Sequence, residues 1–148
     1  MSALPNEAAV KGMTVVVADD DAITRGLLCA VLRNIGMWVQ EEARDGEQAL
    51  AMIQKFRPHV LCLDIEMPGL SGLEALQKLR QTDNDTIVLM ISGATTEENV
   101  RASMTSGADG VIAKPFSSGK LIAEIQRAQA RRRGSRQTAE PAAVAAYK

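Results

Sequence analysis

Asp64, which ends the most apolar run of the sequence, is the residue best placed to do chemistry. The run at residues 60–63 is too short for a helix, and it is flanked by Pro58 before it and Pro68 after it. Such a run predicts a buried strand of a parallel sheet. Because open sheets of this kind bind ligands at the carboxyl ends of their strands, Asp64 lies where a carboxylate could bind or react.

Polar or charged residues follow three other apolar runs in the same way. Residues 13–18, 86–91 and 110–113 are rich in apolar and β-branched residues, which favours strands. The residues that follow these runs are Asp19, Asp20 and Asp21, then Ser92, then Lys114. Each of them alone is explained as a helix cap, a turn residue or a solvated charge. Their occurrence after equivalent strands predicts that they meet at one edge of the sheet.

The segments between the strands carry apolar residues at helical spacing. We expect helices over residues 22–34, from Gly46 up to Pro58, over residues 72–79 and 95–106, and from Ser117 or Ser118 to Arg133. The apolar residues of the first helix are Ile23, Leu27, Leu28, Val31 and Leu32, and Asp21 is its expected N-cap. Thr95 and Glu98 have the spacing of a capping box. With a weaker strand near residues 38–41, five strands alternate with five helices, which predicts an α/β fold with a parallel sheet covered on both faces.

The length and composition fit one folded domain, since 46% of the 148 residues are hydrophobic and 24% are charged. We expect a mobile extension at residues 1–12, the domain at residues 13–130, and a basic helix end with a flexible tail at residues 131–148. The three adjacent arginines at residues 131–133 suit the negative pole of a helix dipole. A contact with a phosphate backbone is the alternative interpretation.

Charge and hydropathy argue against several classes of function. The net charge of -1 gives no overall attraction to nucleic acid or to an anionic membrane. No run reaches the ~18 apolar residues of a membrane span, and residues 1–7 lack the features of a signal peptide, so we expect a cytoplasmic protein. Cys29 and Cys62 lie in apolar segments without a second Cys or His nearby, so we expect both in the core.

The residues at the strand ends resemble the signature motifs of receiver domains of two-component response regulators, including the chemotaxis regulators. The matching segments are residues 17–21, 63–69, 91–93 and 113–116. They occur in the order and spacing of that family, and the resemblance covers residues 13–130. It implies a flavodoxin-like, doubly wound sheet of five parallel strands in the order 2-1-3-4-5, with helices on both faces.

The resemblance also implies a chemistry for the strand-end residues. Asp64 would accept a phosphoryl group from the histidine of a sensor kinase or a phosphotransfer protein, and Ser92 and Lys114 would bind its oxygens. The implied ligands of Mg²⁺ are Asp19, Asp20, Asp64 and the backbone carbonyl of Glu66. Three crowded carboxylates repel one another, and a divalent cation together with the lysine brings the total charge to zero. The chain would catalyse only its own phosphorylation and dephosphorylation, as a switch rather than an enzyme.

A second group of positions is implied to shape the switch. The family has a cis peptide bond before the position of Pro115, which aims the preceding lysine into the site. Val111 stands where many relatives have an aromatic switch residue, so we expect activation through loop and helix shifts instead. Glu66 and Ala94 border the path of the attacking water in the family and are implied to tune the lifetime of the phosphoryl group.

The implied output surface comprises the helix near residues 96–106, the strand at residues 110–113 and the last helix. It would bind a downstream protein whose identity the sequence does not reveal, as a monomer or a phosphorylation-dependent dimer. We expect a free-standing regulator, with the receiver part of a longer transcription or output regulator as the alternative. His59 is expected to be structural, and Met37 and Trp38 are expected to be packed locally.

Two other classes of protein share part of this pattern. Haloacid-dehalogenase-like phosphatases also use an aspartate at a strand end with Mg²⁺, but they carry a second aspartate two residues later, where this chain has Glu66. A nucleotide-binding module needs a Gly-rich loop after a strand. The first strand leads instead into Asp19, Asp20 and Asp21, which would repel phosphates.

Overall fold

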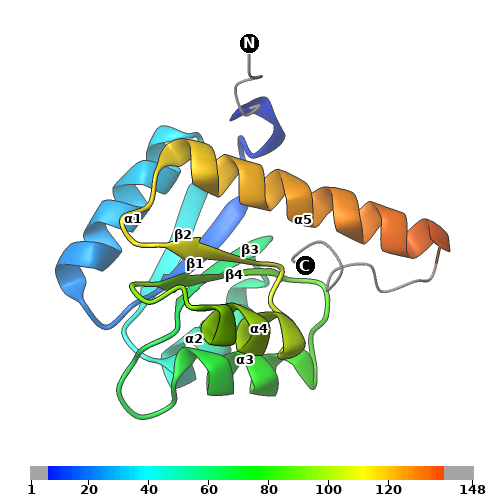
Figure 1. Cartoon of the computed structure of the whole chain (residues 1–148). Helices are drawn as coiled ribbons and strands as arrows, with labels where there is room; N and C mark the ends of the chain where they lie inside the picture. Colours follow the sequence, from blue (N-terminus) through cyan, green and yellow to red (C-terminus); the bar gives the residue numbers. More distant parts are fainter. Residues whose placement is uncertain (1–6, 139–148) are drawn as a thin grey trace.

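The computed structural model describes residues 7–138, which form a three-layer α/β structure (Figure 1). Its five parallel strands lie in the order β2-β1-β3-β4-β5. The strands are β1 (Thr14–Ala18), β2 (Trp38–Ala43), β3 (Val60–Asp64), β4 (Ile87–Ser92) and β5 (Gly110–Ala113). This order confirms the predicted flavodoxin-like sheet.

Helices cover both faces of the sheet. They are the 3-10 helix η1 (Glu7–Ala9) and the α-helices α1 (Ala22–Asn34), α2 (Gly46–Phe56), α3 (Gly72–Arg80), α4 (Glu97–Thr105) and α5 (Ser118–Thr138). Figure 1 shows α1 and α5 on one face and α2, α3 and α4 on the other. None of the helices in residues 7–138 combines the length and the apolar content that a membrane crossing requires.

The central strand β3 supplies side chains to the cores on both faces. Val60 and Cys62 lie in the cluster with α1 and α5, and Leu61 and Leu63 lie in the cluster with α2 and α3. Cys62 is fully buried with its thiol free, and so is Cys29 on α1, so both are core residues as predicted. All five residues of β3 are buried because strands lie on both sides of it and helices on both faces.

Helix α1 differs from the expected pattern in which of its apolar residues are buried. Its N-cap is Asp21, as predicted, whose carboxylate accepts hydrogen bonds from the first turn. Leu28 and Leu32 are buried, but Ile23 is 76% exposed and Leu27 is 59% exposed. The apolar residues occupy more of the helix circumference than one sheet face can cover, so two large side chains remain on the surface beside the loop that follows β1.

The start of α4 also differs from the prediction. Thr96 is the N-cap, with its hydroxyl accepting a hydrogen bond from the N–H of Asn99 at 3.1 Å. The capping box predicted from Thr95 and Glu98 is therefore wrong. Both threonines are suitable N-caps, and spacing alone cannot select between adjacent residues of the same type.

The two ends of the described region are more ordered than the sequence indicated. Val10 is fully buried in the core, so the predicted mobile extension contains a packed segment. Helix α5 continues past its predicted end at Arg133 to Thr138. The remaining residues of the predicted extension and tail lie outside the described residues.

Candidate functional site

Three carboxylates lie together at the carboxyl edge of the sheet. Strands β1 and β3 pair so that Ala18 is opposite Leu63, which places the next residues, Asp19 and Asp64, side by side. One oxygen from each of Asp19, Asp20 and Asp64 lies within 4.8 Å of the others. Asp19 and Asp64 are buried, whereas Asp20 is exposed. The register of two neighbouring strands therefore produces the acidic cluster that the sequence predicted.

Lys114 reaches this cluster from the end of β5. Its ammonium nitrogen is 3.3 Å from Oδ2 of Asp19 and 3.4 Å from Oδ1 of Asp64. Its backbone N–H donates to the carbonyl of Ser92 at 2.8 Å, which ties the ends of β4 and β5 together. The bond between Lys114 and Pro115 is cis, as the resemblance implied.

The electrostatics of the cluster follow from burial and from like charges held close together. Burial, and then the neighbouring Asp19 carboxylate, raise the pKa of Asp64 to about 6 against the opposing effect of Lys114. Burial alone would lower the pKa of the Lys114 ammonium, but Asp64 and Asp19 together outweigh it and raise that pKa. The lysine therefore stays charged, while ionisation of Asp64 is disfavoured.

The donor atoms of the cluster fit a hard divalent cation. Oδ1 of Asp19 accepts a hydrogen bond from the N–H of Asp21 at 2.9 Å. Its Oδ2 is buried and accepts no hydrogen bond from the described residues, with the lysine ammonium as its ion-pair partner. Glu66 is exposed, and its backbone N–H donates a hydrogen bond to the Asp64 carboxylate. Carboxylate oxygens with open lone pairs are the ligands that Mg²⁺ prefers.

Ser92 lies at the same edge, but its hydroxyl is engaged within its own loop. The pairing of Asp64 with Ile91 places Ser92 next to the cluster, and its side chain is fully buried. Its Oγ accepts a hydrogen bond from the N–H of Ala94 at 3.0 Å and donates one to the carbonyl of Ala94 at 3.1 Å. The structure thus brings Ser92 to the site without a direct bond to Asp64.

Two further residues determine the local geometry of the site, and neither had a predicted role in it. A Cβ added at Gly72 would lie 2.0 Å from the carbonyl oxygen of Asp64, so the first turn of α3 can approach the end of β3 only with glycine there. Arg25 on α1 donates to the carbonyl of Asp19 at 2.8 Å and to Glu42 at 3.1 Å. Gly72 could have been singled out from the sequence because it follows the turn at Pro68. The contacts of Arg25 could not, because they depend on tertiary structure.

The remaining predicted positions differ in exposure and in their distance from the site. Val111 is partly buried in β5 and packs on the side of α2, α3 and α4. Ala94 is half-buried in the loop after β4. Met37 is buried, but Trp38 is 69% exposed, so only the first of these two is packed as expected.

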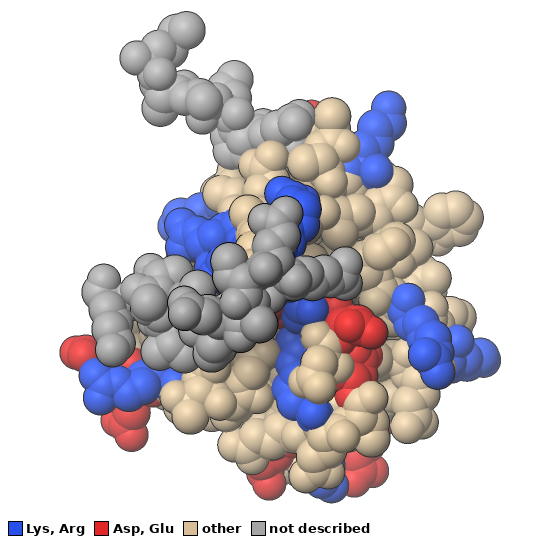
Figure 2. Space-filling model, turned by 90° about the vertical axis from the view of Figure 1, so that its right-hand side faces the viewer, with Lys and Arg blue, Asp and Glu red and all other residues tan. Residues whose placement is uncertain are grey.

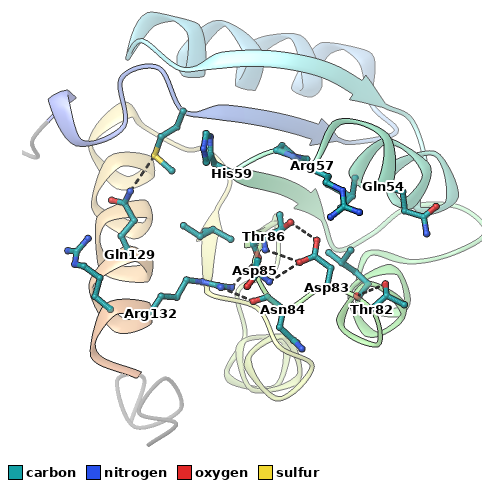
Figure 3. Close-up of a pocket in the computed structure, with 16 residues that line it drawn as sticks. Gln54, Arg57, His59, Thr82, Asp83, Asn84, Asp85, Thr86, Gln129 and Arg132 are labelled. Carbon is teal, nitrogen blue, oxygen red and sulfur yellow. Dashed lines mark hydrogen bonds between the residues drawn. The ribbon is translucent and has the colours of Figure 1, made fainter. Parts of the chain in front are cut away.

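A cavity of about 730 Å³ lies at the opposite edge of the sheet (Figure 3). Its lining includes Met13, His59 and Thr86, which immediately precede β1, β3 and β4. His59 accepts a hydrogen bond from the N–H of Thr14 at 2.9 Å, in agreement with its predicted structural role. The cavity is therefore separated from the acidic cluster by the length of the strands.

Comparison with known proteins identifies one family for most of the chain. The sequence model of the response regulator receiver domain matches residues 15–126. The response regulator MprA of Mycobacterium avium is 38% identical over 132 residues, which are 89% of this chain and 57% of MprA. The chain spans about half the length of the curated relatives it matches. These relatives are regulators rather than typical enzymes.

Solved structures agree with this comparison. The NarL signal receiver domain of Mycobacterium tuberculosis has a TM-score of 0.75 and 30% identity, covering 82% of this chain and 99% of that one. A structure described as the CheX–CheY–BeF3–Mg²⁺ complex of Borrelia burgdorferi has a TM-score of 0.74 and 26% identity, covering 82% and 92%. Given the strand order, the acidic cluster and the matched residues, this chain belongs to the family of response regulator receiver domains.

Proposed function

We propose that Asp64 is the phosphoacceptor of this receiver domain, with residues 13–130 as the functional unit. The observation that carries the proposal is the position of the Lys114 ammonium, 3.3 Å from Asp19 and 3.4 Å from Asp64 at the rim shared by β1 and β3. A lysine so placed is able to pair with a phosphoryl oxygen on Asp64 as a point charge. No second aspartate stands at the position of Glu66, which disfavours the haloacid dehalogenase alternative.

We further propose that Asp19, Asp20 and Asp64, with the backbone carbonyl of Glu66, hold Mg²⁺. Three carboxylates and one ammonium leave a net charge of two negative units, which a divalent cation neutralises. The bound cation would supply charge neutralisation to the transferring phosphoryl group. The Borrelia structure named above contains Mg²⁺ and BeF3 with CheY, which supports the same site in this chain.

The residues of this chain would then act mainly through position and charge. The carboxylate of Asp64 would attack the phosphorus of the donor phosphohistidine while the P–N bond breaks and the imidazole remains on the donor. Lys114 would stay charged and pair with one phosphoryl oxygen. Ser92 donates to another oxygen once its hydroxyl turns away from Ala94. The Glu66 side chain, exposed beside Asp64, and Ala94 border the route of water and would set the rate of hydrolysis.

We propose two protein partners on different surfaces. The donor is the phosphohistidine of a sensor kinase or phosphotransfer protein, and the exposed Ile23 and Leu27 of α1 offer it an apolar contact near Asp20. The downstream protein would bind the surface of α4, β5 and α5. The receiver would act alone, as a dimer or with an attached output domain. Binding of the phosphorylated form to the downstream protein distinguishes these arrangements.

The experiment is incubation with Mg²⁺ and a small acyl-phosphate donor, followed by intact-mass measurement. Wild type should gain one phosphoryl group, and Asp64→Ala should gain none. Asp85→Asn is a matched control because Asp85 is an exposed aspartate at the other edge of the sheet. An adduct that persists in Asp64→Ala, or that never forms in wild type, would refute the assignment.

A further inference from the structure

The carbonyl of Ala94 connects the proposed phosphorylation site to helix α4. It accepts a hydrogen bond from the hydroxyl of Ser92 at 3.1 Å and a second one from the side-chain amide of Asn99 at 2.6 Å. Asn99 lies in the first turn of α4, where its backbone N–H bonds the Thr96 hydroxyl at 3.1 Å. One residue therefore joins the loop after β4 to the capped start of α4 through its side chain and its backbone.

A serine hydroxyl has one hydrogen to donate. In this structure Ser92 gives that hydrogen to Ala94, and the Ser92 side chain is fully buried. A phosphoryl oxygen on Asp64 would compete for the same hydrogen, and its charge makes it the stronger acceptor. When Ser92 turns toward the phosphoryl group, Ala94 retains the hydrogen bond from Asn99.

The fifth strand has no aromatic residue at the switch position that could signal from the site to the surface. The inward-turning residue would be Val111, a partly buried β-branched side chain in β5 with a stiff first torsion. The backbone of residues 92–94 and the hydrogen bond from Asn99 to Ala94 provide a physical link from the site to the first turn of α4. A shift of the Ser92 loop toward Asp64 therefore pulls on the first turn of α4 through the Asn99 amide.

We propose that Asn99 is a positioning residue that couples occupancy of Asp64 to the position of helix α4, an inference that rests on the function proposed above. The coupling runs from Ser92 along the backbone to the Ala94 carbonyl, and from that carbonyl to the Asn99 amide. It replaces the rotation of an aromatic side chain in β5. Asn99 does not contact the phosphoryl group and does not contribute to the chemistry.

The test is nuclear magnetic resonance of the full chain with and without Mg²⁺ and beryllofluoride, whose geometry resembles a phosphoryl group. In wild type the backbone amide signals should shift both at residues 92–94 and in α4. In Asn99→Ala the shifts at residues 92–94 should persist. The shifts in α4 should become smaller, because loss of one hydrogen bond lowers the equilibrium constant for the shifted position of α4 about fivefold.

The variants separate coupling from simple loss of structure. Alanine has a higher helix propensity than asparagine, so Asn99→Ala should leave α4 folded in the ligand-free protein. Asn99→Asp keeps the shape of the side chain but replaces the donor with an acceptor, and should uncouple α4 equally. Glu98→Ala, a change at an exposed neighbouring position, is the matched control and should respond like wild type.

Two outcomes have distinct meanings. If the amide shifts in α4 of both Asn99 variants were as large as in wild type, the role of Asn99 would be overturned. The assignment of Asp64 as phosphoacceptor would still stand. An absence of beryllofluoride-dependent shifts around Asp64 in wild type would overturn the proposed function itself.

Discussion

Asp64 is held in a setting that disfavours its own charge, and this has a measurable consequence for stability. Its pKa is raised to about 6 by burial and by Asp19, from an ordinary value of 3.8. The folded chain therefore binds this proton more tightly than the unfolded chain does. The contribution of Asp64 to the free energy of unfolding falls as pH rises from about 4 to about 6, and stays low above that range.

Asp64→Asn should consequently be more stable than wild type at pH 7.5 in the absence of divalent cations. The expected gain is on the order of 2 kcal/mol, since a shift of one pKa unit corresponds to about 1.4 kcal/mol and some of the effect is screened. At pH 4 most of the gain should be lost, because Asp64 is then protonated in the folded state and only about half ionised in the unfolded state. Urea unfolding at the two pH values measures the difference.

Added Mg²⁺ provides the control for this prediction. It should raise the free energy of unfolding of wild type, because a ligand that binds the folded state stabilises it, and should affect Asp64→Asn much less. A gain for Asp64→Asn that is the same at pH 4 and pH 7.5 would contradict the role assigned to ionisation.

At the scale of single residues, the sequence predicted identities better than contacts. Asp19, Asp64 and Lys114 could be identified because each follows an apolar strand. The hydrogen bonds of Ser92 to Ala94 and the amide contact of Asn99 could not, because they depend on the backbone path of the loop after β4.

At the scale of elements, the approach of α3 to β3 depends on Gly72. Gly72→Ala should destabilise the fold by about 3 kcal/mol or more, because the added methyl would meet the Asp64 carbonyl at 2.0 Å and backbone atoms must move. The displaced Asp64 should also slow adduct formation. Denaturant unfolding and intact-mass time courses measure the two effects.

Gly26→Ala is the matched control for that change. A Cβ at Gly26 meets nothing within 4 Å, and the residue is exposed in the interior of α1. This substitution should stabilise the protein by about 0.5–1 kcal/mol through helix propensity. Equal losses of stability at the two glycines would contradict the importance of the close approach.

The start of α4 gives a second prediction at this scale. Thr96→Ala should cost about 1 kcal/mol because the N–H of Asn99 loses its acceptor. Thr95→Ala should change the free energy of unfolding by less than about 0.5 kcal/mol. Chemical unfolding of the two variants side by side tests the cap, and a larger loss at Thr95 would restore the capping box that the sequence predicted.

The elements themselves were largely predictable, and the exceptions have physical causes. Four of the strands appear as short apolar runs, and the weaker β2 was expected between the first two helices. The order of the strands followed from the family resemblance. The exposed Ile23 and Leu27 were not predicted, since helical spacing does not say how much of a helix surface the sheet covers. The extension of α5 beyond Arg133 was missed because its end lacks apolar periodicity.

At the scale of the whole molecule, an ionic cluster fastens α5 to the edge of the sheet opposite the acids. Arg132 binds both carboxylate oxygens of Asp109, at 3.0 and 2.9 Å, and Arg80 binds the same carboxylate at 3.0 Å. Arg132 also donates to the carbonyls of Asn84 and Thr86. Basic and acidic side chains lie beside one another on the face at which α5 ends (Figure 2).

Arg132→Ala should therefore lower the free energy of unfolding by about 2–3 kcal/mol, because several charge-assisted hydrogen bonds with partly buried groups are lost. Arg101→Ala removes an ion pair with Glu97 whose side chains are 76% and 86% exposed, and should cost less than about 0.5 kcal/mol. Denaturant midpoints at constant slope measure both. Similar losses in the two variants would show that burial of the Asp109 cluster adds little.

The attachment of α5 has a mechanical consequence. A force applied to the end of this helix would pass through Arg132 to Asp109 and to Thr86, which precedes β4. Asp64 lies at the other end of the strands. A domain attached after this helix could therefore be replaced without disturbing the acidic cluster, because Asp109 and the three carboxylates lie at opposite ends of the strands.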